Sequence, residues 1–140
     1  MGKGKFLMEW LSVRRVLSLD DIVAIEEELE IRLPADYVEQ IGAINGGALP
    51  NAVVFVPGIG DISYSRNVSL HKDAVLSVYD LVEAFNMNHI QLFPFGSVGN
   101  GDYFCFDLEK NIVVLRMHET EEVVPVCDTF TQLLEKITIR

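Results

Sequence analysis

The chain has 140 residues, 49% of them hydrophobic, and a formal net charge of −10 at pH 7. This length and composition predict one domain with an ordinary core and exclude a largely disordered chain. The negative charge disfavours binding to nucleic acid and favours a basic partner protein, although acidity that merely maintains solubility accounts for the same charge equally well.

The N-terminal residues differ from the rest of the chain in charge. The first 15 residues carry four bases and one acid, whereas the remaining 125 carry seven bases and 20 acids. We therefore treat residues 1–16 as an N-terminal segment and residues 17–140 as the folded domain. Apolar side chains of the segment lie on one helical face and predict a short docking helix within residues 6–16; they are Phe6, Leu7, Trp10, Leu11 and Val13.

Several features predict a cytoplasmic protein. No apolar run is long enough to span a membrane, and the basic N-terminal stretch is interrupted from Glu9 onward and lacks a cleavage-type site. Cys105 and Cys127 are the only cysteines, and both lie in expected strands without metal-site spacing. They predict two buried thiols in a reducing compartment.

A first helix is predicted after Ser18. Ser18 acts as N-cap, Asp21 stands three residues on as in a capping box, and Ile22, Ile25 and Leu29 follow at helical spacing. The polar side of this helix carries Glu26, Glu27, Glu28 and Glu30. These acids are most simply a solvated face, and partner binding is the minority interpretation.

A second helix begins in Leu33-Pro34-Ala35-Asp36-Tyr37, with Pro34 at its first position, and ends at Asn45-Gly46-Gly47. We expect the two helices to form a hairpin joined by two or three residues.

The remaining chain predicts mostly strands. They are expected at residues 53–56, 59–64, 92–95, 103–107, 112–117 and 123–127, with a polar loop at 65–72. Pro125 favours an edge position or a bulge. One helix capped by Ser77 and ending near residues 86–88 interrupts the strands, and another, capped by Asp128 and burying Ile137, closes the chain. Consecutive strands with hairpin turns indicate a single α+β domain, a mainly antiparallel sheet with helices on one face or end.

The glycine-rich stretch from Gly96 to Asp102 invites comparison with a phosphate-binding loop. A strand rather than a helix is expected to follow it, and no lysine closes it, so a tight turn is favoured. His71, His89 and His118 lack metal-site spacing, and no cofactor or metal is predicted. Asp102, His118 and Glu119 leave an acid/base enzyme as a minor alternative, because no nucleophile is placed beside them.

Acidic residues occur at strand ends and turns, and would form a patch if the turns gather at one rim of the sheet. They are Asp61, Asp102, Asp107, Glu109, Glu119, Glu121 and Glu122. Ordinary charged turns are the competing interpretation. The partner-binding residues that we predict are Asp61, Asn100, Asp102, Glu119, Glu121 and Glu122.

The order of several motifs resembles the SUKH superfamily. Leu33 to Tyr37 followed by Asn45-Gly46-Gly47 is similar to its first motif. Phe93-Pro94-Phe95-Gly96, then Gly99 to Asp102 and the run to Asp107, is similar to its second. Residues 113–119 and 124–134 are similar to its C-terminal strand and closing helix, so that residues 17–140 form a SUKH-like domain.

The resemblance implies an α+β fold with one sheet packed against helices and a role without catalysis. It further implies a cytoplasmic immunity protein, a monomer or weak homo-oligomer, that binds and neutralises a polymorphic bacterial toxin of nuclease or deaminase type. The alternative is a housekeeping regulatory module without a toxin partner, because the superfamily includes the yeast cell-wall-synthesis regulators. Residues 1–16 and 59–76 match no motif, and partner specificity is expected there.

Overall fold

The computed structural model describes residues 9–13, 16–71, 77–85 and 91–140. Its helices are α2 (Leu19–Leu29), α3 (Ala35–Ile44), α4 (Val78–Phe85) and α5 (Phe130–Lys136). Its strands are β1 (Ala52–Val56), β2 (Gly60–Ser63), β3 (Arg66–Asn67), β4 (Leu92–Ser97), β5 (Tyr103–Asp107), β6 (Ile112–Arg116), β7 (Val123–Cys127) and β8 (Ile137–Ile139). The predicted α+β single domain is confirmed.

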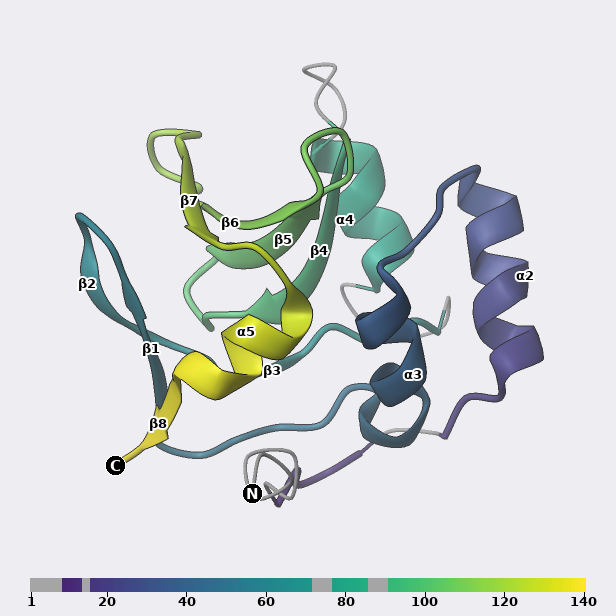
Figure 1. Ribbon diagram of the computed structural model, residues 1–140, viewed down its shortest axis with the longest axis horizontal. Helices are drawn as coiled ribbons and strands as arrows, with labels where there is room; N and C mark the ends of the chain where they lie inside the picture. The colour runs from purple at the N-terminus through teal and green to yellow at the C-terminus, as the bar shows by residue number, and fades with distance from the viewer. Residues whose placement is uncertain (1–8, 14–15, 72–76, 86–90) are drawn as a thin grey trace.

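The strands form two antiparallel sheets, not the single sheet that the resemblance implies. The larger sheet has the order β3-β4-β5-β6-β7, and the smaller has the order β2-β1-β8 (Figure 1). The smaller sheet exists because the last residues of the chain return to β1, where Ile139 pairs with Ala52 and Ile137 with Val54. The prediction that Ile137 belongs to the closing helix is therefore wrong.

Helices cover both faces of the larger sheet, which corrects the expectation of helices on one face. Successive residues of a strand point to opposite faces. Phe106 of β5 packs against Tyr37 of α3 and Phe130 of α5, with ring centroids 5.0 Å and 6.1 Å apart. Tyr103, of opposite parity, instead meets Phe85 of α4, with 5.7 Å between the ring centroids. In Figure 1 α4 lies beside β4, across the sheet from α5.

Tyr37 lies at the centre of the core, which explains its place in the first motif. Its side chain is fully buried and forms ring contacts with Phe93, Phe95, Phe106 and Phe130. These aromatic contacts, three edge-on and one tilted, join α3 and α5 to β4 and β5.

A buried polar network connects the end of α3 to the strand β3. Tyr64 Oη donates to Asn67 Oδ1 at 2.6 Å, and Asn67 Nδ2 donates to the carbonyl of Ile44 at 3.0 Å. The N–H of Leu70 donates to Asn45 Oδ1 at 2.9 Å. Arg66 and Asn67 also pair with Ser97 and Gly96 of β4, so the prediction of a loop is wrong at Arg66–Asn67.

The second motif has a steric explanation. Tyr64 lies against Gly96, where a Cβ atom would come within 2.4 Å of the Tyr64 ring. Gly96 is therefore required by close approach of a buried side chain, as glycine often is within a strand.

Helix boundaries agree with the sequence at some ends and differ at others. The capping box of Ser18 and Asp21 is confirmed. Pro34 is the N-cap of α3 rather than its first residue, and five residues, 30–34, link α2 to α3. Thr129, not Asp128, caps α5, because the Thr129 hydroxyl accepts the N–H of Gln132 at 3.0 Å.

The predictions for β7 and for the N-terminal segment have different outcomes. β7 is an edge strand with a register irregularity opposite Pro125, as predicted. Residues 9–13 are not helical: Leu11 forms a β-bridge with Ala48. The rest of the predicted docking helix falls partly on residues outside those described, as does the predicted end of α4 near residues 86–88.

Candidate partner-binding site

Five of the six predicted partner-binding residues lie at one end of the larger sheet. The β4–β5 loop carries Asn100 and Asp102, and the β6–β7 turn carries Glu119, Glu121 and Glu122. Because β4 to β7 are antiparallel neighbours, these two connections lie at the same end. We call these five residues the acidic rim.

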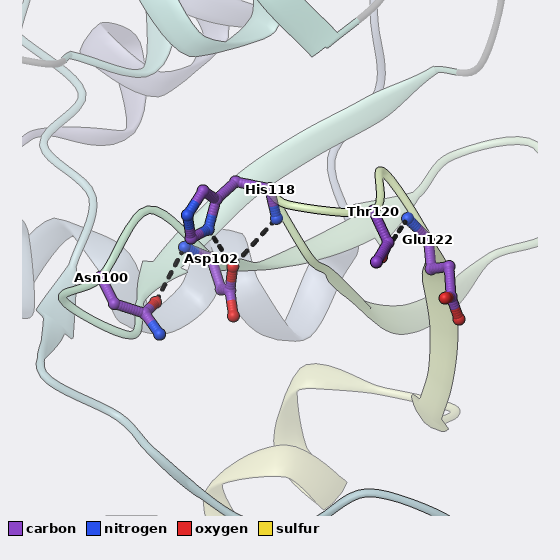
Figure 2. A network of polar contacts seen from close by, with 5 residues as sticks. All are labelled: Asn100, Asp102, His118, Thr120 and Glu122. Atoms are coloured by element: carbon purple, nitrogen blue, oxygen red, sulfur yellow. Dashed lines mark hydrogen bonds and ion pairs between the residues drawn. The ribbon is translucent and has the colours of Figure 1, made fainter.

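Asp102 forms several of the hydrogen bonds within the acidic rim. Its Oδ1 accepts the backbone N–H of His118 at 2.9 Å and lies 2.6 Å from the ring Nδ1 of His118 (Figure 2). Asn100 Oδ1 in turn accepts the N–H of Asp102 at 3.0 Å. The ring of His118 lies beside Gly101, where a Cβ atom would come within 3.1 Å of it.

The β4–β5 loop is a tight turn followed by a strand, as predicted in place of a phosphate loop. Gly99 and Gly101 have φ values of +106° and +101°, a region that favours glycine. The N–H of Val98 closes the turn on the carbonyl of Asp102 at 3.1 Å.

The β6–β7 turn forms a separate cluster. Glu121 lies 3.8 Å from the guanidinium of Arg116, which also covers the ring of Phe85 at 4.2 Å. The N–H of Glu122 donates to the Thr120 hydroxyl at 3.3 Å, and Figure 2 draws no bond from this pair to Asp102 or His118. Asp102 and Glu121 thus already face basic side chains within the protein.

Asp61 and the remaining turn acids lie elsewhere. Asp61 belongs to β2 of the smaller sheet, where it pairs with Arg140. Asp107 and Glu109 lie at the opposite end of the β5–β6 hairpin from the acidic rim. The predicted single patch is therefore divided into three locations.

In the structure, two of the three residues of the acid/base alternative contact each other. Asp102 and His118 are hydrogen-bonded, but no hydrogen bond or ion pair links Glu119 to them within the described part of the chain. Neither thiol is an activated nucleophile, since burial raises the pKa of Cys127 to about 11 and that of Cys105 well above its usual range. Cys127 is only half-buried, whereas the sequence predicted a buried thiol.

Sequence reasoning missed the main cavity of the domain. A cavity of about 880 Å³ lies between the end of α2, the 30–34 linker, the β5–β6 turn and the start of α5. It is lined by six acids, Glu26, Glu27, Glu30, Asp36, Asp107 and Asp128, and by one base, Arg32. One signal was available: Glu26 to Glu30 cluster at the C-terminal end of a helix, where acids are unfavourable.

The described residues contain neither a membrane-spanning helix nor a metal-binding group of side chains. None of their helices is long and apolar enough to cross a membrane. Among them, no three histidine, cysteine or acidic side chains group as a metal ion would require.

The described residues form a single α+β domain whose surface includes charged turns and the acidic cavity. A family model described as SMI1 / KNR4 family (SUKH-1) matches residues 17–136, and the chain therefore belongs to this family. The match includes every helix of the described structure and all strands except β8. No curated protein sequence matches the chain significantly.

Family membership indicates a general class of function, without a specific partner. The family includes immunity proteins, and its members are generally non-catalytic immunity or regulatory proteins. Protein partners are accordingly the general expectation for this domain.

Proposed function

We propose that this protein is a cytoplasmic immunity protein that binds a polymorphic bacterial toxin, of nuclease or deaminase type, and neutralises it by covering its active site or substrate groove. The observation that carries the proposal is membership of the SMI1 / KNR4 family over residues 17–136. The net charge of −10 supports it, because a toxin that acts on nucleic acid presents a basic surface and is attracted by an acidic protein.

Among the exposed acids, those of the acidic rim are one proposed contact surface. Asp102 and Glu121 contact His118 and Arg116, which leaves Glu119 and Glu122 as its acids without such a contact in the described structure. Asp61 stays a predicted contact residue, although Arg140 neutralises part of its charge.

Co-expression with the toxin domain encoded beside this gene tests the proposal. We expect this protein to restore growth to cells that express the toxin domain and to co-purify with it. A neighbouring toxin domain that is neither bound nor neutralised contradicts the proposal.

The alternative is a regulatory interaction module without a toxin, which the regulatory members of the same family favour. This alternative is supported if no toxin gene lies nearby and deletion of the gene alters growth in the absence of any toxin. The two functions are therefore separated by gene neighbourhood and by the deletion phenotype.

A further inference from the structure

We infer that the 880 Å³ cavity described above binds a basic side chain, arginine or lysine, on a partner segment whose flanking apolar residues lie along α2. This inference rests on the proposed function for the class of its partner, a basic protein, and it names the part of the surface that receives it.

The charge of the cavity is uncompensated. Six carboxylates and one guanidinium line it, and none of the seven forms an ion pair within the described part of the chain. Glu26 and Asp36 accept hydrogen bonds from protein N–H groups, at 2.7 Å from Leu33 and 2.8 Å from Thr131. Such bonds fix the positions of the two carboxylates within the protein. A cation that enters the cavity therefore meets acidic side chains that are already held in place.

Asp107 provides an independent observation that points to a ligand. Asp107 is only 6% exposed, and its Oδ1 accepts hydrogen bonds from the N–H groups of Glu109 and Lys110 at 3.1 Å each. Its Oδ2 accepts no hydrogen bond from the described residues, yet it is not among the fully enclosed unpaired atoms. Asp107 is one of the residues that line the cavity. A guanidinium or ammonium group supplies the donor that Oδ2 lacks.

The cavity also has an apolar component that extends beyond it. Phe106, Phe130 and Leu33 are buried residues that line it. Val23 lines it as well and is 40% exposed, and Leu19, one turn earlier on the same face of α2, is 64% exposed. This continuous surface is longer than a single small cation, and it fits a peptide segment with apolar residues beside the basic one.

The stability of α2 gives no reason for two of its acids. Glu27 lies in the last turn and Glu30 at the C-cap, and no base accompanies them in the last turn. The helix dipole makes negative charge unfavourable at this end. Their presence is explained if they attract a cation from outside the domain.

Two peptides titrated into ¹⁵N-labelled full-length protein test the inference. One is Ac-Ala-Leu-Arg-Leu-Ala-NH2, and the other carries citrulline, which has the same shape without the charge, in place of arginine. We expect the arginine peptide to shift the amide signals of Leu108, Lys110 and Thr129, and the citrulline peptide to bind at least about tenfold more weakly. Equal binding of the two peptides, or shifts confined to the acidic rim, overturns the inference.

Variants locate the site. We expect Glu27→Gln/Glu30→Gln to lower the affinity for the arginine peptide about threefold or more, and Asp107→Asn to lower it about tenfold. Asp107→Asn keeps an Oδ1 acceptor for the turn, and the exposed glutamate pair provides the test if that variant fails to fold. The matched control, Glu9→Gln/Glu83→Gln at two exposed positions outside both the cavity and the acidic rim, removes the same charge and should change the affinity by less than about twofold. A larger effect of the control than of the cavity variants overturns the inference.

The segment and the proposed function are tested separately. Leu19→Ser should lower the affinity of the protein for the peptide but not for free arginine amide. Equal affinities of the unmodified protein for the peptide and for the amide overturn the claim that apolar residues of the partner segment lie along α2. Peptide binding in the cavity does not require the toxin. A failed immunity function therefore appears as the absence of growth rescue, and a failed cavity appears as the absence of arginine-dependent shifts.

Discussion

Two buried tyrosines differ in whether the hydroxyl group has a hydrogen-bond partner. The Tyr64 hydroxyl donates to Asn67, whereas the Tyr37 hydroxyl is the one fully enclosed side-chain polar atom that has no partner within the described structure. Burial raises the pKa of both phenols, so both remain protonated. Tyr37 is thus retained for its ring, which the aromatic core requires.

Replacement of each tyrosine by phenylalanine tests this difference. Tyr37→Phe removes an unpaired buried hydroxyl and should leave the free energy of unfolding unchanged or raise it by up to about 1 kcal/mol. Tyr64→Phe leaves Asn67 without its donor and should lower it by about 1–3 kcal/mol. Urea unfolding measures both as shifts of the midpoint at a constant slope. A greater loss in Tyr37→Phe than in Tyr64→Phe contradicts the assignment.

Cys127 makes a prediction about pH. Burial raises its pKa from 9.0 to about 11, so at pH 8 the folded protein has about a hundredfold less Cys127 thiolate than an ordinary thiol would. The unfolded chain loses this proton first, so the contribution of Cys127 to stability is complete below about pH 9 and declines as pH rises through 11.

Reaction with a disulfide reagent at pH 8 measures this effect. Cys127 should react slowly in the folded Cys105→Ala variant and at the normal rate after unfolding in urea. A fast reaction in the folded variant would show that the thiol is neither buried nor protonated.

At the scale of the element, α2 combines a stabilising first turn with an unfavourable last one. Asp20 and Asp21 lie in the first turn, where negative charge is favourable, and Glu27 and Glu30 lie at the other end. Glu27→Gln/Glu30→Gln should therefore raise the free energy of unfolding by about 0.5–1 kcal/mol, and Asp20→Asn should lower it by about 0.3–1 kcal/mol. Thermal unfolding at low salt measures both. The same sign for both variants would remove the argument that the glutamates cost stability.

Long periodic elements were predictable, and short ones were not. The capping box at Ser18 and the apolar run from Tyr103 to Phe106, all of it buried in β5, specify their elements locally. β3 and β8 have two and three residues and depend on distant partners, such as the pairing of Ile139 with Ala52. Sequence periodicity is not observable over so few residues.

The site was predictable only in part, for a similar reason. Turn residues next to predicted strands identified the acidic rim, because hairpin order places those turns together. The cavity joins the end of α2 to the β5–β6 turn and to the start of α5, which are about 80 and 100 residues away along the chain. No local pattern relates Glu30 to Asp107 or Asp128.

At the scale of the whole molecule, the acidic rim and the cavity lie at opposite ends of β5 and β6. Five residues of extended strand separate them by about 14 Å, which is less than the width of a standard protein interface. A partner that contacts both ends must therefore extend along the intervening strands. The family membership and the charge of −10 make a basic toxin domain the proposed partner.

The kinetics of binding to the neighbouring toxin domain, measured at two salt concentrations, test the central claim most directly. We predict a stable complex whose association rate falls at least about tenfold between 20 mM and 300 mM salt, because charge attraction accelerates the encounter and salt screens it. Inhibition of the toxin should appear at one equivalent of this protein. A toxin domain that remains fully active in its presence, with no measurable complex at either salt concentration, would contradict the account.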